Sequence, residues 1–135
     1  MLMDVAHIDH VNLHVPEDGV ETATDFYADR LGFETEGTDA FESGEKPFFA
    51  IRLTPEHVIH LWPTPEFDPP DGTSFNHVAL VVAASIDEIE AALKGAGVDV
   101  VERLEAPRGA TGESPAVYVR DPFGYQVELK AATDR

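Results

Sequence analysis

Two halves of the chain resemble each other, and this internal repeat restricts the possible fold more than any other feature of the sequence. The segment His10-Val-Asn-Leu-His-Val15 is similar to His77-Val-Ala-Leu-Val-Val82. Each has the pattern of a strand, and each is followed by a helix-like segment and then by further strand-like runs. Such a repeat indicates one supersecondary unit used twice. The sequence therefore predicts the order β-α-β-β-β, present two times.

The expected elements follow from hydrophobic patterns and from their stop signals. Gly32 ends the first helix, and Ser85 with Glu88 has the spacing of a capping box at the start of the second. The turn at 121–124 precedes the last strand. The expected helices are 20–31 and 86–94, and the expected strands are 10–15, 33–35, 48–53, 58–62, 77–82, 98–104, 116–120 and 125–130.

We expect residues 1–135 to form a single α+β domain of two βαβββ modules. Module one covers about 5–62 and module two about 75–131. The segment 63–74 between them holds four prolines, at 63, 65, 69 and 70, and is expected to be neither strand nor helix. One such module leaves a sheet face poorly covered, and a second module can bury it. The expected result is a half-barrel with a cleft between the modules.

The repeat also relates residues that are suited to bind a metal. His10 corresponds to His77 and His60 to Glu128, at offsets of 67 and 68 positions. The chain contains no cysteine, so a metal site has to use His, Asp, Glu or backbone oxygen. Imidazole and carboxylate together suit Fe, Mn, Ni, Zn or Co. We therefore expect one divalent metal ion, with His10, His77 and Glu128 as ligands and His60 as a fourth ligand or an acid/base group.

Side-chain alternation along each expected strand gives further cleft-lining candidates. Asn12 shares the face of His10, Trp62 that of His60, and Gln126 and Lys130 that of Glu128. Polar side chains at these positions suit substrate orientation, and aromatic ones suit an apolar wall. The predicted substrate-binding residues are Asn12, Arg52, Trp62 and Gln126, and Phe48 is expected to form the apolar wall together with Trp62.

The other histidines are expected to have no part in the site. His7 and His57 are expected to be solvated, and His14 is expected to be partly buried.

Charge and hydropathy exclude several classes of partner. The 26 acidic and 9 basic residues give a net charge of −17, which repels nucleic-acid phosphates. No apolar run is long enough to span a membrane. The first ten residues have neither a basic start nor an apolar signal core. We expect a cytoplasmic protein that acts on a small molecule and binds neither nucleic acid nor membrane.

Three motifs carry a resemblance to a known superfamily. They are the segments Asp9–Val15 and Asn76–Leu80 and the ending Tyr118-Val-Arg-Asp-Pro-Phe-Gly-Tyr-Gln-Val-Glu128-Leu129. The chain resembles, over nearly its whole length, the vicinal-oxygen-chelate superfamily of glyoxalases, bleomycin-resistance proteins and extradiol dioxygenases. That resemblance implies paired βαβββ modules, often in a homodimer, with a metal in the cleft. It also implies that His10, His77 and Glu128 match the shared ligand positions.

The resemblance leaves four functions open. A glyoxalase-like lyase or isomerase would chelate adjacent substrate oxygens, although His60 stands where glyoxalase I usually has a glutamate. An Fe(II) extradiol dioxygenase would use His60 and Tyr118 as catalytic residues, but the histidine expected upstream of that tyrosine is absent from 108–113. A bleomycin-resistance-like binder usually lacks the ligands retained here. A fosfomycin-type enzyme would need a cation cluster, for which only Arg52, Arg108 and Arg120 are candidates. We expect an enzyme of the lyase or isomerase class.

Overall fold

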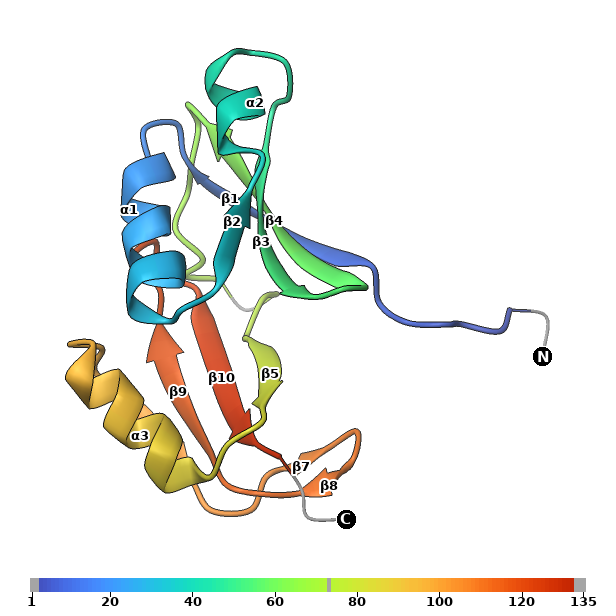
Figure 1. Ribbon diagram of the computed structural model, residues 1–135, viewed down its shortest axis with the longest axis vertical. Coiled ribbons are helices and arrows are strands. Elements are labelled where there is room, and N and C mark those ends of the chain that lie inside the picture. Colours follow the sequence, from blue (N-terminus) through green and yellow to red (C-terminus); the bar gives the residue numbers. More distant parts are fainter. Residues whose placement is uncertain (1–2, 73, 133–135) are drawn as a thin grey trace. The chain divides into compact units, whose positions relative to one another are not determined.

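The computed structural model describes residues 3–72 and 74–132, and the chain divides into two compact units between Asp68 and Pro69. Residue 73 of the expected linker and the ends of the expected domain, 1–2 and 133–135, lie outside the described residues. Each unit contains its own mixed four-stranded sheet with a helical segment after the first strand (Figure 1). The predicted α+β class with two βαβββ modules is confirmed.

Unit 1 has the strand order β1-β4-β3-β2, in which β1 and β4 are parallel and the other neighbours antiparallel. The helix α1 continues directly into a π-helical segment, η1. The elements are β1 (His10–Pro16), α1 (Val20–Thr24), η1 (Asp25–Arg30), β2 (Glu34–Glu36), α2 (Thr38–Glu42), β3 (Phe49–Thr54) and β4 (His57–Thr64).

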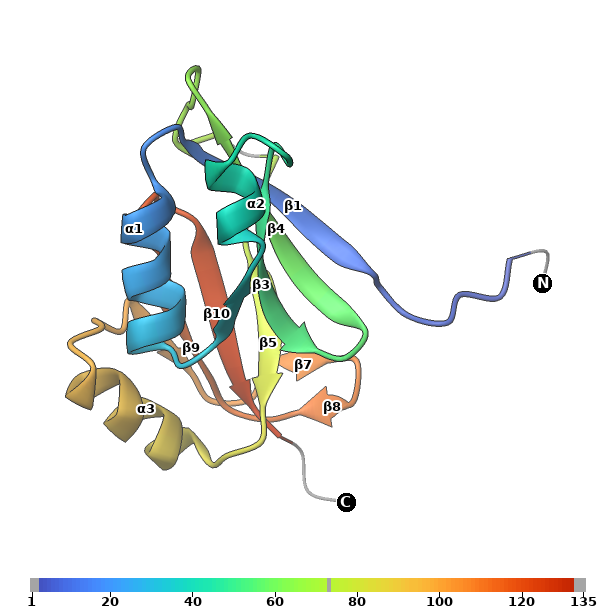
Figure 2. The same cartoon turned by 45° about the horizontal axis from the view of Figure 1, so that its top comes forward.

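Unit 2 has the equivalent order β5-β10-β9-β6, again with its first and last long strands parallel. A small hairpin of β7 and β8 is inserted before β9 (Figure 2). The elements are β5 (Val78–Val82), α3 (Ile86–Gly95), β6 (Glu102–Leu104), β7 (Arg108–Gly109), β8 (Gly112–Glu113), β9 (Ala116–Arg120) and β10 (Gln126–Ala131).

The strand register gives the two units the same internal geometry. His60 is paired with Asn12, two residues after His10, and Glu128 is paired with Ala79, two residues after His77. A shift of one residue would turn each side chain to the opposite face of its sheet. The matching registers therefore place the His10–His60 and His77–Glu128 pairs at equivalent points of the two sheets.

Each sheet buries its apolar alternates. On β1, Leu13 and Val15 are buried while His10 and Asn12 are exposed, as the alternation predicted. His14 was expected to be partly buried, but it lies on the same face as His10 and Asn12 and is exposed as well. The helix α3 packs against β9 and β10 (Figure 1) and buries Ile86, Ile89 and Leu93 at helical spacing. None of the helices formed by residues 3–72 and 74–132 is long and apolar enough to cross a bilayer.

Several sequence expectations need correction. The segment 63–74 was expected to hold no strand, but β4 extends through Pro63 to Thr64. Beyond Leu61 this strand is paired with β1 alone, and a proline is tolerated where one side of a strand is unpaired. The strand expected at 98–104 begins only at Glu102, because the Val98 amide donates to the Leu93 carbonyl and closes the end of α3. The short helix α2 and the β7–β8 hairpin were not predicted.

Lys130 differs most from its expected environment. It was placed on the cleft-lining face with Gln126 and Glu128, yet it is only 3% exposed. Its Nζ donates to the carbonyl oxygens of Pro107 and Ser114, on the two sides of the β7–β8 hairpin. The alternation was correct, but the hairpin that covers this end of β10 was not foreseen.

The capping box at the start of α3 supports a prediction about stability. Ser85 Oγ accepts from the Glu88 amide at 3.2 Å, and Glu88 Oε1 accepts from the Ser85 amide at 3.0 Å. We expect Ser85→Ala to lower the free energy of unfolding by about 1 kcal/mol. Urea unfolding measures this change. The control Ser43→Ala, which lies at the end of the short helix α2, is expected to have a smaller effect, and equal effects would contradict the role of the cap.

Candidate functional site

In unit 2 the residue just before β5 and a residue of β10 bring a histidine and a carboxylate together. His77 Nε2 lies 3.1 Å from Glu128 Oε1, and the Glu128 side chain is only 7% exposed while that of His77 is 30% exposed. Two ligand atoms each about 2.1 Å from one metal ion, at right angles, lie about 3.0 Å apart. The observed separation therefore fits two adjacent positions in a metal coordination shell.

The residue before His77 determines which ring nitrogen is available. His77 Nδ1 lies 2.6 Å from Asn76 Oδ1, so Nδ1 carries the hydrogen that this bond requires. A neutral imidazole then presents the lone pair of Nε2 to the carboxylate oxygen of Glu128, and both of these atoms are acceptors. A proton or a metal cation has to lie between them. Neutral imidazole beside a carboxylate is a donor set that suits a divalent transition metal.

Tyr118 completes the cluster in unit 2. Its ring lies 5.1 Å from the His77 ring in an edge-on arrangement, and Tyr118 is paired with Glu128 across β9 and β10. Burial raises the pKa of the Tyr118 hydroxyl, and the Glu128 charge and a hydrogen bond to Glu128 raise it further. The hydroxyl is therefore protonated at neutral pH, and its single hydrogen is donated to Glu128.

Unit 1 brings two of its histidines, His10 and His60, together at the equivalent place. The rings of His10 and His60 are stacked, with centroids 4.1 Å apart. His10 Nδ1 donates to Asp9 Oδ2 at 2.8 Å, which leaves the lone pair on Nε2. This hydrogen bond lowers the pKa of the Asp9 carboxyl. Asp9 thus accepts a hydrogen bond from Nδ1 of His10, as Asn76 does from Nδ1 of His77. Such partners orient metal-binding histidines.

His60 continues into a row of aromatic rings. Phe48 lies 4.3 Å from His60 and 5.7 Å from Trp62, measured between ring centroids. Burial lowers the pKa of His60, and the electrostatic effect of the neighbouring His10 lowers it further, against a smaller opposite effect of Asp9. His60 is therefore neutral at pH 7, and the row offers a flat apolar surface beside it.

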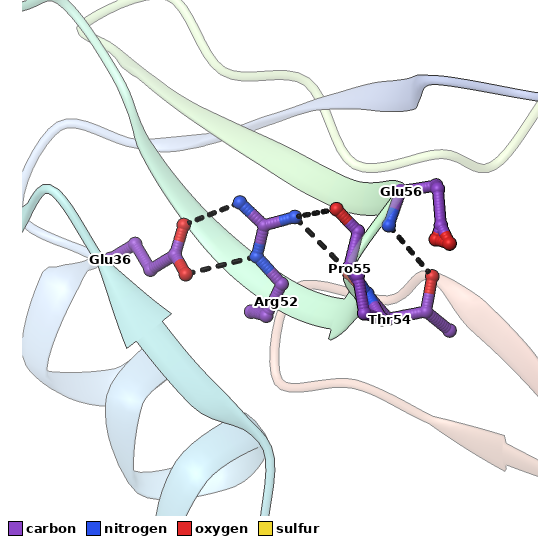
Figure 3. Close-up of polar contacts among 5 residues, drawn as sticks. All are labelled: Glu36, Arg52, Thr54, Pro55 and Glu56. Carbon is purple, nitrogen blue, oxygen red and sulfur yellow. Dashed lines mark hydrogen bonds and ion pairs between the residues drawn. The ribbon is translucent and has the colours of Figure 1, made fainter.

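The remaining predicted residues lie in different surroundings. Asn12 is exposed on β1 opposite His60, and Gln126 is half-buried opposite Arg120. Arg52 has most of its donors engaged: Nε and Nη2 each donate to Glu36 at 2.9 Å, and Nη1 donates to the carbonyls of Thr54 and Pro55 (Figure 3). These contacts give Arg52 a structural use, and its predicted role in substrate binding remains a prediction.

Two orienting residues were missed when the sequence was interpreted. Asp9 and Asn76 were noted only as parts of motifs, yet they hold the two histidines from repeat-related positions. Their signal was present, since each immediately precedes a ligand candidate. Among residues 3–72 and 74–132, no group of three or more His, Cys, Asp or Glu side chains is gathered to hold a metal. Within each unit one pair of candidate ligands is in contact, His10 with His60 in unit 1 and His77 with Glu128 in unit 2.

Known proteins are similar to this chain in sequence and in fold. The chain is 27% identical over 128 residues to virulence protein STM3117 of Salmonella typhimurium, with 94% of this chain and 85% of the relative covered. The crystal structure of that protein has a TM-score of 0.75 at 25% identity, covering 97% of this chain and all of that one.

More distant solved structures share the fold alone. An integron cassette protein from the mobile metagenome of V. cholerae has a TM-score of 0.75 at 23% identity, covering 98% of this chain and all of that one. Lactoylglutathione lyase from Agrobacterium tumefaciens has a TM-score of 0.67 at 20% identity, covering 96% of both chains. The fold is thus the glyoxalase-like α+β fold.

A family model covers most of the chain as well. Residues 7–129 match the model of the Glyoxalase/Bleomycin resistance protein/Dioxygenase superfamily. The matched range includes the candidate residues His10, His60, His77, Tyr118 and Glu128. The chain belongs to this superfamily.

Proposed function

We propose that the chain is a divalent-metal-dependent enzyme of the lyase or isomerase class, acting on a small substrate with two adjacent oxygens. The observation that carries the proposal is the contact of His77 Nε2 with Glu128 Oε1 at 3.1 Å. Two acceptor atoms face each other there, which suits a cation between them. Superfamily membership supports the same class of chemistry, since the superfamily includes glyoxalases.

In this proposal His10, His77 and Glu128 bind the metal, and His60 serves as a fourth ligand or as the base. Asp9 and Asn76 keep the Nε2 lone pairs of His10 and His77 available. When bound, the metal supplies Lewis-acid polarisation of two adjacent substrate oxygens.

His60 is the group best suited to move a proton. Because burial and the neighbouring His10 lower its pKa, it is neutral at pH 7 and can accept a proton from a hydroxyl-bearing carbon next to a carbonyl. His60 then returns this proton to the former carbonyl carbon, while the hydroxyl proton moves to the former carbonyl oxygen. The hydroxyl and the carbonyl thus exchange places without any further reactant. Phe48 and Trp62 stack in a row with His60 and can hold the apolar part of a substrate, while Asn12 and Gln126 orient its polar part.

An Fe(II) extradiol dioxygenase is the second candidate. The edge-on contact of Tyr118 with His77 favours it, since a protonated tyrosine beside the ligands would donate to a substrate oxygen once its hydrogen turns away from Glu128. His60 would then act as the acid/base group, and two histidines with one carboxylate would form the facial arrangement of non-haem iron.

One series of measurements separates these functions. The chain is purified, stripped with chelator, and reloaded separately with Fe(II), Mn, Ni, Zn and Co. Isomerisation of an α-oxoaldehyde hemithioacetal supports the lyase or isomerase class. Ring cleavage of catechol with O₂ consumption by the Fe(II) form would replace it with the dioxygenase. Failure to retain any of these metals would favour a non-catalytic, bleomycin-resistance-like binding protein. Native mass with and without metal tests the homodimer.

The role of Asn76 gives a specific prediction. Asn76→Ala removes the acceptor of the His77 Nδ1 hydrogen, and we expect metal affinity to fall by about 10–100-fold. Asn76→Asp retains an acceptor and is expected to keep affinity within a few-fold of the original. Isothermal titration with Zn measures both. Equal affinity of the two variants would show that Asn76 does not orient the ligand.

A further inference from the structure

A pocket in unit 2 lies next to the His77–Glu128 pair. Its volume is about 450 Å³. It is lined by the end of β9, the start of β10 and the segment before β5, including Asp71, Phe75, Asn76, Arg120, Gly124 and Gln126. Asn76 is the residue that orients His77, and Gln126 shares the face of β10 with Glu128. Through Asn76 and Gln126 the pocket therefore adjoins the candidate ligands His77 and Glu128.

The pocket contains Arg120. Unlike the other arginines of the described residues, Arg120 has no carboxylate that neutralises its charge. Among the described residues, Arg30, Arg52, Arg103 and Arg108 each have a carboxylate within ion-pair distance, and Arg120 has none. Its Nη1 donates to the Gly124 carbonyl at 2.9 Å, which fixes one side of the guanidinium. An arginine without a carboxylate partner is unusual in a chain of net charge −17, because acidic side chains far outnumber basic ones.

The strand register sets the distance from Arg120 to the ligands. Arg120 is paired with Gln126 and Tyr118 with Glu128 across β9 and β10. Two residues along a strand correspond to about 7 Å. One small molecule can therefore reach from Glu128 to the Arg120 guanidinium.

We propose that the substrate carries an oxyanion, a carboxylate or phosphate, that Arg120 binds in this pocket while its adjacent oxygens lie at His77 and Glu128. The inference rests on the proposed function and adds the substrate class. Arginine suits this use because its planar donors match an oxyanion and stay charged. Asp71 also lines the pocket and opposes an anion, and it has no ion pair with Arg120 in the described part of the chain.

The test uses two chelating probes that differ by one carboxylate. Catechol and 3,4-dihydroxybenzoate are titrated into the Zn-loaded full chain, which performs no O₂ chemistry. We expect the carboxylate-bearing probe to bind about tenfold more tightly, the effect of a hydrogen bond to a charged group. Arg120→Gln should abolish this preference and leave catechol binding unchanged. Asp71→Asn should strengthen the preference.

The matched control is Arg108→Gln, which removes the same charge from the exposed β7–β8 hairpin of the same unit. It is expected to keep the preference, and loss of preference there would overturn the inference by showing a non-specific charge effect. Equal binding of both probes by the unsubstituted chain would also overturn it. Absence of any catechol binding would instead contradict the proposed chelation. Competition by inorganic phosphate and by acetate assigns the preferred oxyanion, and failure of both to compete would contradict the pocket's role.

Discussion

Glu128→Gln is expected to lower the affinity for divalent metal by more than about a hundredfold while leaving the metal-free protein as stable as before. Loss of a partner that only orients a ligand already weakens affinity by about 10–100-fold, and Glu128 is a proposed ligand itself. In the metal-free chain, the buried carboxylate carries a desolvation penalty that a neutral amide avoids. Glutamine keeps the shape of the side chain and can still contact His77.

Two measurements check this expectation. Isothermal titration with Zn gives the affinity, and thermal unfolding in the presence of chelator gives the stability of the metal-free form. A control is Glu113→Gln, an acidic residue of the exposed hairpin, which is expected to change neither value. If Glu128→Gln retained full affinity, or if its only effect were a large loss of stability without metal, Glu128 would be a structural residue.

Lys130→Ala is expected to produce the largest loss of stability among the polar residues discussed. The side chain is buried, and Nζ donates to the carbonyls of Pro107 and Ser114. Hydrogen bonds from a charged donor contribute about 1.5–3 kcal/mol. Removal of the aliphatic stem adds the loss of packing. The desolvation cost of the buried ammonium, which alanine does not have, offsets part of this loss. We expect the free energy of unfolding to fall by about 3 kcal/mol in total.

The position of the loss is as informative as its size. Hydrogen exchange should accelerate first in residues 107–114, because Lys130 joins the two sides of the β7–β8 hairpin. Lys130→Met, which keeps the stem without the donor, should recover part of the stability. The exposed Lys46→Ala serves as a surface control and should have little effect. Unchanged hydrogen exchange in the hairpin would contradict this role of Lys130.

The sequence predicted what repeated patterns encode. The strand at Ala116–Arg120 was placed at the observed bounds, and the capping box of Ser85 and Glu88 is present, because each depends on a few neighbouring residues. The helix expected at 20–31 is present but divides into α1 and the π-helical η1. Side-chain pattern does not distinguish the hydrogen bonding of these two helix types.

Other features depend on contacts between distant residues. The helix α2 has only five residues, too few for a periodic pattern. The burial of Lys130 depends on carbonyls contributed by a hairpin earlier in the chain. For the candidate site, the repeat predicted that His10 is equivalent to His77 and His60 to Glu128. In the structure His10 contacts His60 within unit 1, and His77 contacts Glu128 within unit 2. The contacts of Arg52 with Glu36 could not be read from sequence spacing.

The parallel pairing of the first and last long strands in each unit has a consequence for folding during synthesis. β1 leaves the ribosome early, but its hydrogen-bonding partner β4 is made only at the end of its unit, and the same holds for β5 and β10. Contacts between distant parts of a chain form late because the loop between them must close first. His10 therefore meets His60, and His77 meets Glu128, only when each unit is complete. A nascent chain that stops short of either closing strand would lack a ligand pair.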